Sequence, residues 1–458
     1  MAFILGIRSK LLCLLLLCSC VSYSQVFNNF YSSDAVPITG NVGIATPDGG
    51  YLFGGTANNG IDLEITKIDF EGTVQWSYIY DLNKVNFPEY ITGISIIKNN
   101  SSNWQGFLIV GTTYNDINTV NNSSDPFVLK VGLSGNLDWV RAFTRTDETS
   151  LYGGFDKGIK AEELNDGSIV VSMDVLGDAG ILRLNENGDF LNGSAAASSK
   201  VVNAGGCCPI AFTSTEEING GILNASSDHY IMVGEANSES NSFYYLLDFN
   251  LPSSSAPTVS FGKMLGGSPE KKSLLSVDKL PNGDYIACGY TEEDALGGIG
   301  DRDGVVMRLS NIGEVVWAKR IGSAASDSFS KIIYDALTGN VVCYGVTKKL
   351  TGNDRGVGII MDLSGNIIIQ NSLENTSLVS DINIATGNRY IITGSSQNRI
   401  HAYIANNSDL SNSACAFANP DLLPSDITVS NGNIGLPSNS PFELSEAFNN
   451  YSNSGVNQ

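Results

Sequence analysis

The chain has 458 residues, and its 42% hydrophobic content is enough to bury a sizeable core. Its 49 glycines and only 16% charged residues favour many short strands joined by tight turns and disfavour long surface helices. The formal net charge of −21 argues against nucleic acid or an anionic membrane as a partner, because those surfaces bind clustered lysine and arginine.

The first 24 residues have the organisation of a signal peptide. Arg8 and Lys10 precede an apolar run, 11–21, that is too short to span a bilayer. Ser22 and Ser24 then place small residues at the −3 and −1 positions of a cleavage site. We therefore expect cleavage after Ser24 and a mature chain that is exported, with no membrane insertion once the signal is removed.

A second processing route starts from the same segment. Residues 17–20 resemble a bacterial lipobox in which Cys20 would be lipidated and would anchor the protein at the outer membrane. Cys18 is an unusual residue inside a lipobox, so secretion into the medium or display at the cell surface is the first expectation.

A unit of roughly 50–60 residues recurs seven times between residues 25 and 410, a period typical of propeller blades. Its clearest marker is a run of β-branched and aromatic residues ending near a glycine, which predicts a strand. The seven runs are 51–56, 107–112, 169–173, 230–234, 285–291, 341–347 and 390–394. Turns such as 47–50 and 281–284 precede these runs and contain the glycine that tight hairpins require.

A second hairpin follows the first in each unit, as at 63–69 and 74–80. Four residues after its turn glycine stand Trp76, Trp139 and Trp317, and this fixed position favours packing between neighbouring blades over a ligand platform. With four strands per unit and no helical periodicity, we predict an all-β fold, a seven-bladed β-propeller of four-stranded antiparallel blades.

The seventh unit lacks a fourth strand, because it ends in a polar stretch at 406–409. Residues 25–31, directly after the signal, have the apolar character of the missing strand. We therefore predict that the N-terminal strand completes the seventh blade and closes the ring. The propeller then spans residues 25–410.

Residues 411–458 are crowded with Asn, Ser, Pro and Gly and show no sustained period. We expect an irregular C-terminal tail or linker, with a short strand around 427–429. A tail of this kind also fits a structural segment of a larger adhesin.

Five of the eight cysteines lie beyond the signal segment, and an odd count argues against a full disulfide framework. Cys288 and Cys343 stand inside apolar strand runs and are expected in the core. Cys207 or Cys208 could pair with Cys415 in an oxidising compartment. None of these cysteines has metal-ligand spacing.

These units resemble the β-propeller repeats of secreted and surface proteins of Bacteroidota. The shared pattern runs from an Asp-Gly-Gly-Tyr turn through a strand ending in Gly-Thr to a glycine turn and a tryptophan. Residues 48–76 and 282–317 follow it closely, whereas the third and fourth units depart from it and lack the tryptophan. The resemblance implies the fold and an exported location, and it implies no single activity.

Catalytic signatures are missing from the sequence, which contains no Gly-x-Ser-x-Gly elbow, no P-loop and no His-Glu-x-x-His motif. His229 and His401 are expected at strand ends or on the surface. We therefore assign no catalytic, cofactor-binding or metal residues and expect no enzyme and no cofactor.

An acidic residue recurs in the loop before the third strand of most units. These residues are Asp62, Asp125, Asp178, Asp301, Asp303 and Asp354. The first interpretation is that they accept backbone N–H bonds in the turn, and the alternative is that they bind calcium.

The expected function is a binding, display or adhesion-type scaffold, monomeric, with an unknown protein or glycan ligand at one ring face or in the central channel. The alternative is a propeller enzyme acting on polysaccharide, a lyase or hydrolase, which predicts a deep axial pocket with clustered carboxylates, histidine or arginine.

Overall fold

The computed structural model describes most of the chain beyond the N-terminal segment. The described residues are 27–31, 39–57, 61–82, 88–98, 104–115, 123–145, 156–175, 177–202, 215–224, 226, 228–238, 240–293, 302–323, 325–348, 354–373, 378–385, 387–396, 399–410, 417–418, 423–426, 429, 431–433, 444–446 and 452–454. The expected signal peptide, with Cys20, therefore lies outside them.

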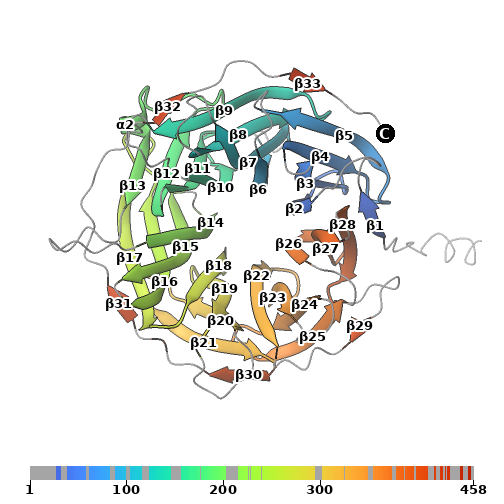
Figure 1. Ribbon diagram of the computed structural model, residues 1–458, viewed down its shortest axis with the longest axis vertical. Helices are drawn as coiled ribbons and strands as arrows, with labels where there is room; N and C mark the ends of the chain where they lie inside the picture. Colours follow the sequence, from blue (N-terminus) through green and yellow to red (C-terminus); the bar gives the residue numbers. More distant parts are fainter. Residues whose placement is uncertain are drawn as a thin grey trace, which may run out of the picture.

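Seven antiparallel sheets are arranged in a ring around a central axis (Figure 1). The innermost strands are β2 (Thr39–Ala45), β6 (Glu89–Ile97), β10 (Asp156–Glu163), β14 (Thr215–Leu223), β18 (Lys272–Lys279), β22 (Ser326–Asp335) and β26 (Leu378–Ala385). The second strands are β3 (Tyr51–Ala57), β7 (Gly106–Asn115), β11 (Ile169–Val175), β15 (His229–Ser238), β19 (Tyr285–Thr291), β23 (Asn340–Lys348) and β27 (Arg389–Ser396).

The outer half of each sheet is a second antiparallel pair. The third strands are β4 (Asp62–Ile68), β8 (Ser123–Gly132), β12 (Asp178–Leu184), β16 (Asn241–Asn250), β20 (Asp303–Leu309), β24 (Arg355–Met361) and β28 (Arg399–Asn406). The fourth strands are β5 (Val74–Asp81), β9 (Leu137–Arg145), β13 (Ser199–Val202), β17 (Thr258–Ser268), β21 (Val315–Gly322), β25 (Ile367–Leu373) and, in the seventh blade, β1 (Asn28–Tyr31). The predicted seven-bladed β-propeller is confirmed.

The N-terminal strand closes the ring as predicted. β1 pairs antiparallel with β28, and the backbone N–H of Ile404 donates to the carbonyl of Phe27 at 3.1 Å. Phe27 packs edge-on against Tyr51 of the first blade, with ring centroids 5.5 Å apart. The Tyr31 hydroxyl donates to the Gly72 carbonyl at 2.9 Å. One strand thus completes the last blade and joins it to the first.

The cores lie between neighbouring blades, because each sheet buries both faces. In the second and third blades, for example, Val110 packs in one apolar cluster with Val171 and Met173. Cys288 and Cys343 lie in the cluster between the fifth and sixth blades and are fully buried, as expected. Cys207, Cys208 and Cys415 lie outside the described residues.

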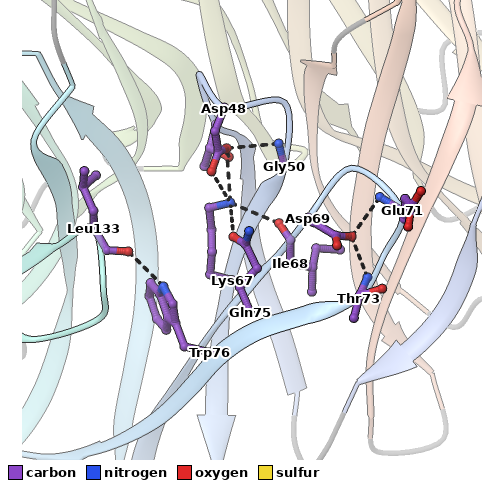
Figure 2. Close-up of polar contacts among 11 residues, drawn as sticks. Asp48, Gly50, Lys67, Ile68, Asp69, Glu71, Thr73, Gln75, Trp76 and Leu133 are labelled. Carbon is purple, nitrogen blue, oxygen red and sulfur yellow. Dashed lines mark hydrogen bonds and ion pairs between the residues drawn. The ribbon is translucent and has the colours of Figure 1, made fainter.

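The tryptophans join neighbouring blades through a directed bond. The Trp76 indole N–H donates to the Leu133 carbonyl of the next blade at 2.9 Å, as Figure 2 shows. Trp139 and Trp317 make the equivalent bonds to the next blade at 3.0 Å. Gly135, in the turn that receives Trp76, has a φ of 83°, and a Cβ there would lie 2.9 Å from the indole. The predicted packing role of the tryptophans is confirmed.

Other polar side chains join the interfaces where no tryptophan is present. Arg183 of the third blade donates to the Leu251 carbonyl at 3.1 Å. Lys263 of the fourth blade pairs with Glu314 of the fifth at 2.6 Å. Asn371 of the sixth blade donates to the backbone that follows β28. With the Tyr31 bond, each of the seven interfaces has at least one such contact.

Buried cations hold the hairpin turns onto the sheets. The Lys67 ammonium, 1% exposed, lies 3.0 Å from Asp48 and 2.9 Å from Gln75 and also donates to the Ile68 carbonyl (Figure 2). These neighbours satisfy the ammonium group. A buried charge without such partners would strongly destabilise the fold. Equivalent ion pairs in the third and fifth blades are Arg183–Asp166 and Arg308–Asp284.

The third blade departs most from the repeat. After β12 its chain leaves the sheet, and an isolated antiparallel bridge joins Leu184 to Phe190. A four-residue helix, α2 (Ala195–Ser198), follows, and the chain then returns to the sheet as the short β13. Asn192, at the tryptophan position, therefore lies in a turn and not in a strand.

The C-terminal segment contains more regular structure than its sequence predicts. Five short strands pair antiparallel with the outer edges of five blades, in reverse order around the ring (Figure 1). They are β29 (Phe417–Ala418), β30 (Leu423–Asp426), β31 (Asn431–Asn433), β32 (Leu444–Glu446) and β33 (Ser452–Ser454). A strand was expected around 427–429, but residues 427 and 428 lie outside the described part and residue 429 is not in a strand. We call these five strands the outer belt.

No helix in the described part of the chain is long and apolar enough to cross a membrane.

Candidate functional site

Every innermost strand carries a β-bulge at the same place. The register shifts lie between Gly40 and Val42, Ile91 and Gly93, Gly158 and Lys160, Ile218 and Gly220, Leu274 and Ser276, Phe329 and Lys331, and Val379 and Asp381. A bulge inserts one residue and re-aims the side chains that follow it. Seven equivalent bulges therefore bring seven equivalent positions to the axis, of which five carry side chains and two are glycines.

These side chains line a cavity of about 440 Å³ on the axis of the ring. The first layer, directly after the bulges, consists of Val42, Gly93, Lys160, Gly220, Ser276, Lys331 and Asp381. The second layer, two residues further along each strand, consists of Ile44, Ser95, Glu162, Ile222, Asp278, Ile333 and Asn383. Residues two apart share a face of a strand, so each blade contributes one residue to each layer. We call this cavity the axial channel.

The charged residues of the channel form close pairs. The Lys331 ammonium lies 3.0 Å from Asp381, with 30% of the lysine side chain and 7% of the aspartate exposed. The Lys160 ammonium lies 3.2 Å from Glu162, and 26% and 19% of these side chains are exposed. Both lysines thus keep a face toward the channel while each holds a carboxylate.

The carboxylates also bond the backbone of the next blade. The Tyr334 N–H donates to Asp278 at 2.7 Å, the Leu223 N–H to Glu162 at 3.3 Å and the Gly43 N–H to Asp381 at 3.2 Å. Innermost strands of neighbouring blades share no backbone ladder, so these bonds link them side by side. The carboxylates therefore have a structural role at the channel wall.

Burial and charge act against each other on the pKa values of these groups. Burial raises the pKa of Asp278, and backbone N–H bonds and the charges of Lys160 and Lys331 oppose that rise. Burial disfavours the Lys331 ammonium, but the Asp381 and Asp278 carboxylates outweigh burial and raise the lysine pKa. Lys331 is therefore a cation at neutral pH.

The two histidines lie outside the channel lining. His229 begins β15, and its Nδ1 lies 2.8 Å from Asp248 and 3.4 Å from the Ser260 hydroxyl. In a Ser-His-Asp triad the serine contacts the other ring nitrogen, so this arrangement is not that of a triad. His401 is 5% exposed in β28 and hydrogen-bonds Asn28 of β1. It was expected at a strand end or on the surface, and it is buried because β1 covers it.

The acidic residues before the third strands are not brought together. Asp62, Asp125, Asp178 and Asp303 stand in β4, β8, β12 and β20, each in a different blade. Asp303 pairs with Arg320 of its own blade. Asp354 directly precedes β24, and Asp301 lies outside the described residues. Within the described ranges, no group of three or more His, Cys, Asp or Glu side chains is placed to hold a metal ion.

The charged residues of the axial channel were missed by the sequence analysis. Asp278, Lys331 and Asp381 each interrupt an apolar run of an innermost strand, and that interruption is the signal that could have found them. Lys160 and Glu162 lie in a largely charged strand and give no such signal. Their convergence depends on the bulges, which the sequence does not mark.

No family model and no curated protein matches the chain. Among solved structures it is similar to a protein of unknown function from Bacteroides caccae, at 15% identity and a TM-score of 0.37 over 70% of this chain and 93% of that one. It is similar to a mutant of puromycin hydrolase at 10% identity and a TM-score of 0.48, over 83% of this chain and 54% of that one. It is also similar to the Nup133 β-propeller domain of Vanderwaltozyma polyspora, at 8% identity and a TM-score of 0.44, over 84% and 99%. The chain thus spans about half the length of the hydrolase. These likenesses concern the fold and do not indicate a ligand.

Proposed function

We propose that this protein is an exported binding module, secreted or displayed at the cell surface, whose ligand occupies the axial channel. The observation that carries the proposal is the double layer of channel residues, in which each of the seven blades contributes one residue per layer to a single cavity. Loops and strand ends of several blades converge at such an axis, which is where a rigid ring can surround a small ligand.

The export route rests on the N-terminal segment and on the resemblance of the units to Bacteroidota repeats. We expect a mature chain beginning at Gln25. Expression in a bacterial host of that phylum, followed by cell fractionation and N-terminal sequencing, tests this expectation. The lipid-anchored route would instead be supported if the wild type were found in the outer-membrane fraction and a Cys20→Ala variant were absent from it.

Ligand binding in the channel can be tested with a substitution that fills it. Ile222 lines the channel, and Ile222→Trp adds an indole to its second layer. Ile368 is 52% exposed on β25 and away from the channel lining, so Ile368→Trp is a matched control. In a thermal-shift screen of glycans and peptides, ligands should stabilise the wild type and Ile368→Trp but not Ile222→Trp. A ligand that stabilises all three proteins equally would place binding elsewhere.

An enzyme acting on polysaccharide remains the second candidate, because three carboxylates face the channel. Glycoside hydrolysis needs one carboxylic acid and one carboxylate on either side of the scissile bond. Asp278 has a raised pKa and would be the acid. Release of reducing ends from an acidic or neutral polysaccharide, abolished by Asp278→Asn, would establish this activity over simple binding.

A further inference from the structure

The lysines of the axial channel offer hydrogen-bond donors to a ligand. An ammonium group has three N–H donors. Within the described residues, Lys331 forms an ion pair with Asp381 and Lys160 with Glu162. Each lysine therefore has N–H groups left for a ligand, and each keeps about a quarter or more of its side chain exposed.

The channel carboxylates, by contrast, have a donor on both oxygens. Asp278 accepts the N–H of Lys279 at 2.8 Å on one oxygen and that of Tyr334 at 2.7 Å on the other. Asp381 accepts Lys331 and its neighbour's N–H on one oxygen, and the Gly43 N–H on the other. A cationic ligand would share these oxygens with donors that already bind them, whereas an anion would use the remaining N–H groups of the two lysines.

The two lysines approach the cavity from different sides. Lys160 is on β10 and Lys331 on β22, and these strands lie on opposite sides of the axis (Figure 1). Both residues follow the bulge of their strand, so they belong to the same layer. Asp278, on β18 between them, interacts electrostatically with both. An anion on the axis can therefore contact an ammonium from either side.

The remaining wall suits an apolar group. Val42 and Ile44 of the first blade and Ile222 of the fourth line the same cavity. A volume of about 440 Å³ is near the lower end of the range for small-molecule pockets, roughly 300–1,000 Å³. The cavity therefore suits a small molecule with one charged and one apolar part.

We infer that the axial channel binds a small carboxylate-bearing molecule, whose carboxylate is held by Lys160 and Lys331 and whose apolar part packs against Ile44 and Ile222. This inference rests on the proposed function. A carboxylate adds attraction between opposite charges to its hydrogen bonds with the two ammonium groups, and a hydroxyl does not. The net charge of −21 gives no long-range attraction for an anion, so affinity comes from contacts inside the channel.

Isothermal titration calorimetry with matched probes at pH 7 tests the inference. One pair is D-glucuronate and D-glucose, and the other set is hexanoate, hexan-1-ol and hexylamine. At least one carboxylate should bind ten-fold or more tightly than its neutral or cationic counterpart. Glucuronate binding indicates a sugar acid as the source of the carboxylate, and hexanoate binding indicates an aliphatic acid.

Substitutions assign the contact to the lysines. Lys160→Met and Lys331→Met should each weaken carboxylate binding ten-fold or more, Lys331→Arg should retain it, and Lys271→Met, at an exposed position, should leave it unchanged. If Lys331→Met fails to fold, the other three variants still decide. Equal binding of the neutral or amine probe would overturn the carboxylate inference while keeping the channel as a binding site. Binding of no probe would overturn the inference alone, because the thermal-shift screen judges the proposed function separately.

Discussion

His401, which the N-terminal strand covers, makes the free energy of unfolding depend on pH. Burial lowers its pKa from 6.5 to about 4, because β1 covers the ring. The unfolded chain therefore binds a proton between these two values that the folded chain does not. The free energy of unfolding contributed by this group is complete above pH 6.5 and decreases as the pH falls toward 4.

We predict that the wild type loses about 3 kcal/mol more than a His401→Gln variant between pH 7 and pH 4, given that a shift of one pKa unit corresponds to about 1.4 kcal/mol. Glutamine supplies an amide that can hydrogen-bond Asn28 but does not titrate. Urea unfolding at several pH values measures the difference. Parallel pH profiles for the two proteins would show that His401 titrates alike in the folded and unfolded chain.

The channel residues show at the same scale why the site was hidden in the sequence. Lys160 and Lys331 are separated by three blades along the chain, and nothing in their local sequence marks them as partners. Neither histidine contributes to the channel, because one binds Asp248 at a strand end and the other is covered by β1. The lining of the channel thus depends on which residues follow the bulges.

At the scale of single elements, β1 was predictable because the seventh unit of the sequence lacks a fourth strand. A blade with three strands leaves an unpaired edge, and the apolar segment at 25–31 supplied the only nearby strand of matching character. The tryptophan contacts were predictable for a similar reason, since a fixed offset from a turn glycine fixes a place in the blade. The innermost bulges were not, because a register shift leaves no residue signature of its own.

Deletion of residues 25–31 should destabilise the protein by about 3–6 kcal/mol, because Phe27 and Tyr31 are buried and each such side chain contributes roughly 1.5–3 kcal/mol. Differential scanning calorimetry of the deletion variant beside the wild type measures the loss. A Phe27→Ala variant, which keeps the strand, should lie between the two. An unchanged melting temperature in the deletion variant would mean that β1 does not close the ring.

At the scale of the whole molecule, the outer belt changes the role of the C-terminal segment. Its strands are two to four residues long and pair through the backbone, so their sequence has no hydrophobic alternation to predict them. They cover the outer edges of five blades, edges that would otherwise be open to pairing with other chains.

Removal of residues 417–458 should lower the melting temperature and promote self-association. The stability loss should be about 2–5 kcal/mol, since each net backbone hydrogen bond contributes roughly 0.5–1.5 kcal/mol. A chain ending after residue 433, which keeps β29 to β31, should show an intermediate loss. Thermal unfolding and size-exclusion chromatography of the three lengths test this, and identical behaviour of all three would contradict a stabilising belt.

The ring, its closure and its blades follow from repeats that the sequence displays, whereas the proposed ligand site forms only where seven strands meet at one axis. The most direct measurement is a crystal structure of the protein soaked with 4-bromobenzoate, with anomalous data collected at the bromine edge. We predict a bromine peak inside the axial channel and the carboxylate between Lys160 and Lys331. A channel without the probe at saturating concentration, or a probe bound only on the outer surface, would contradict the account.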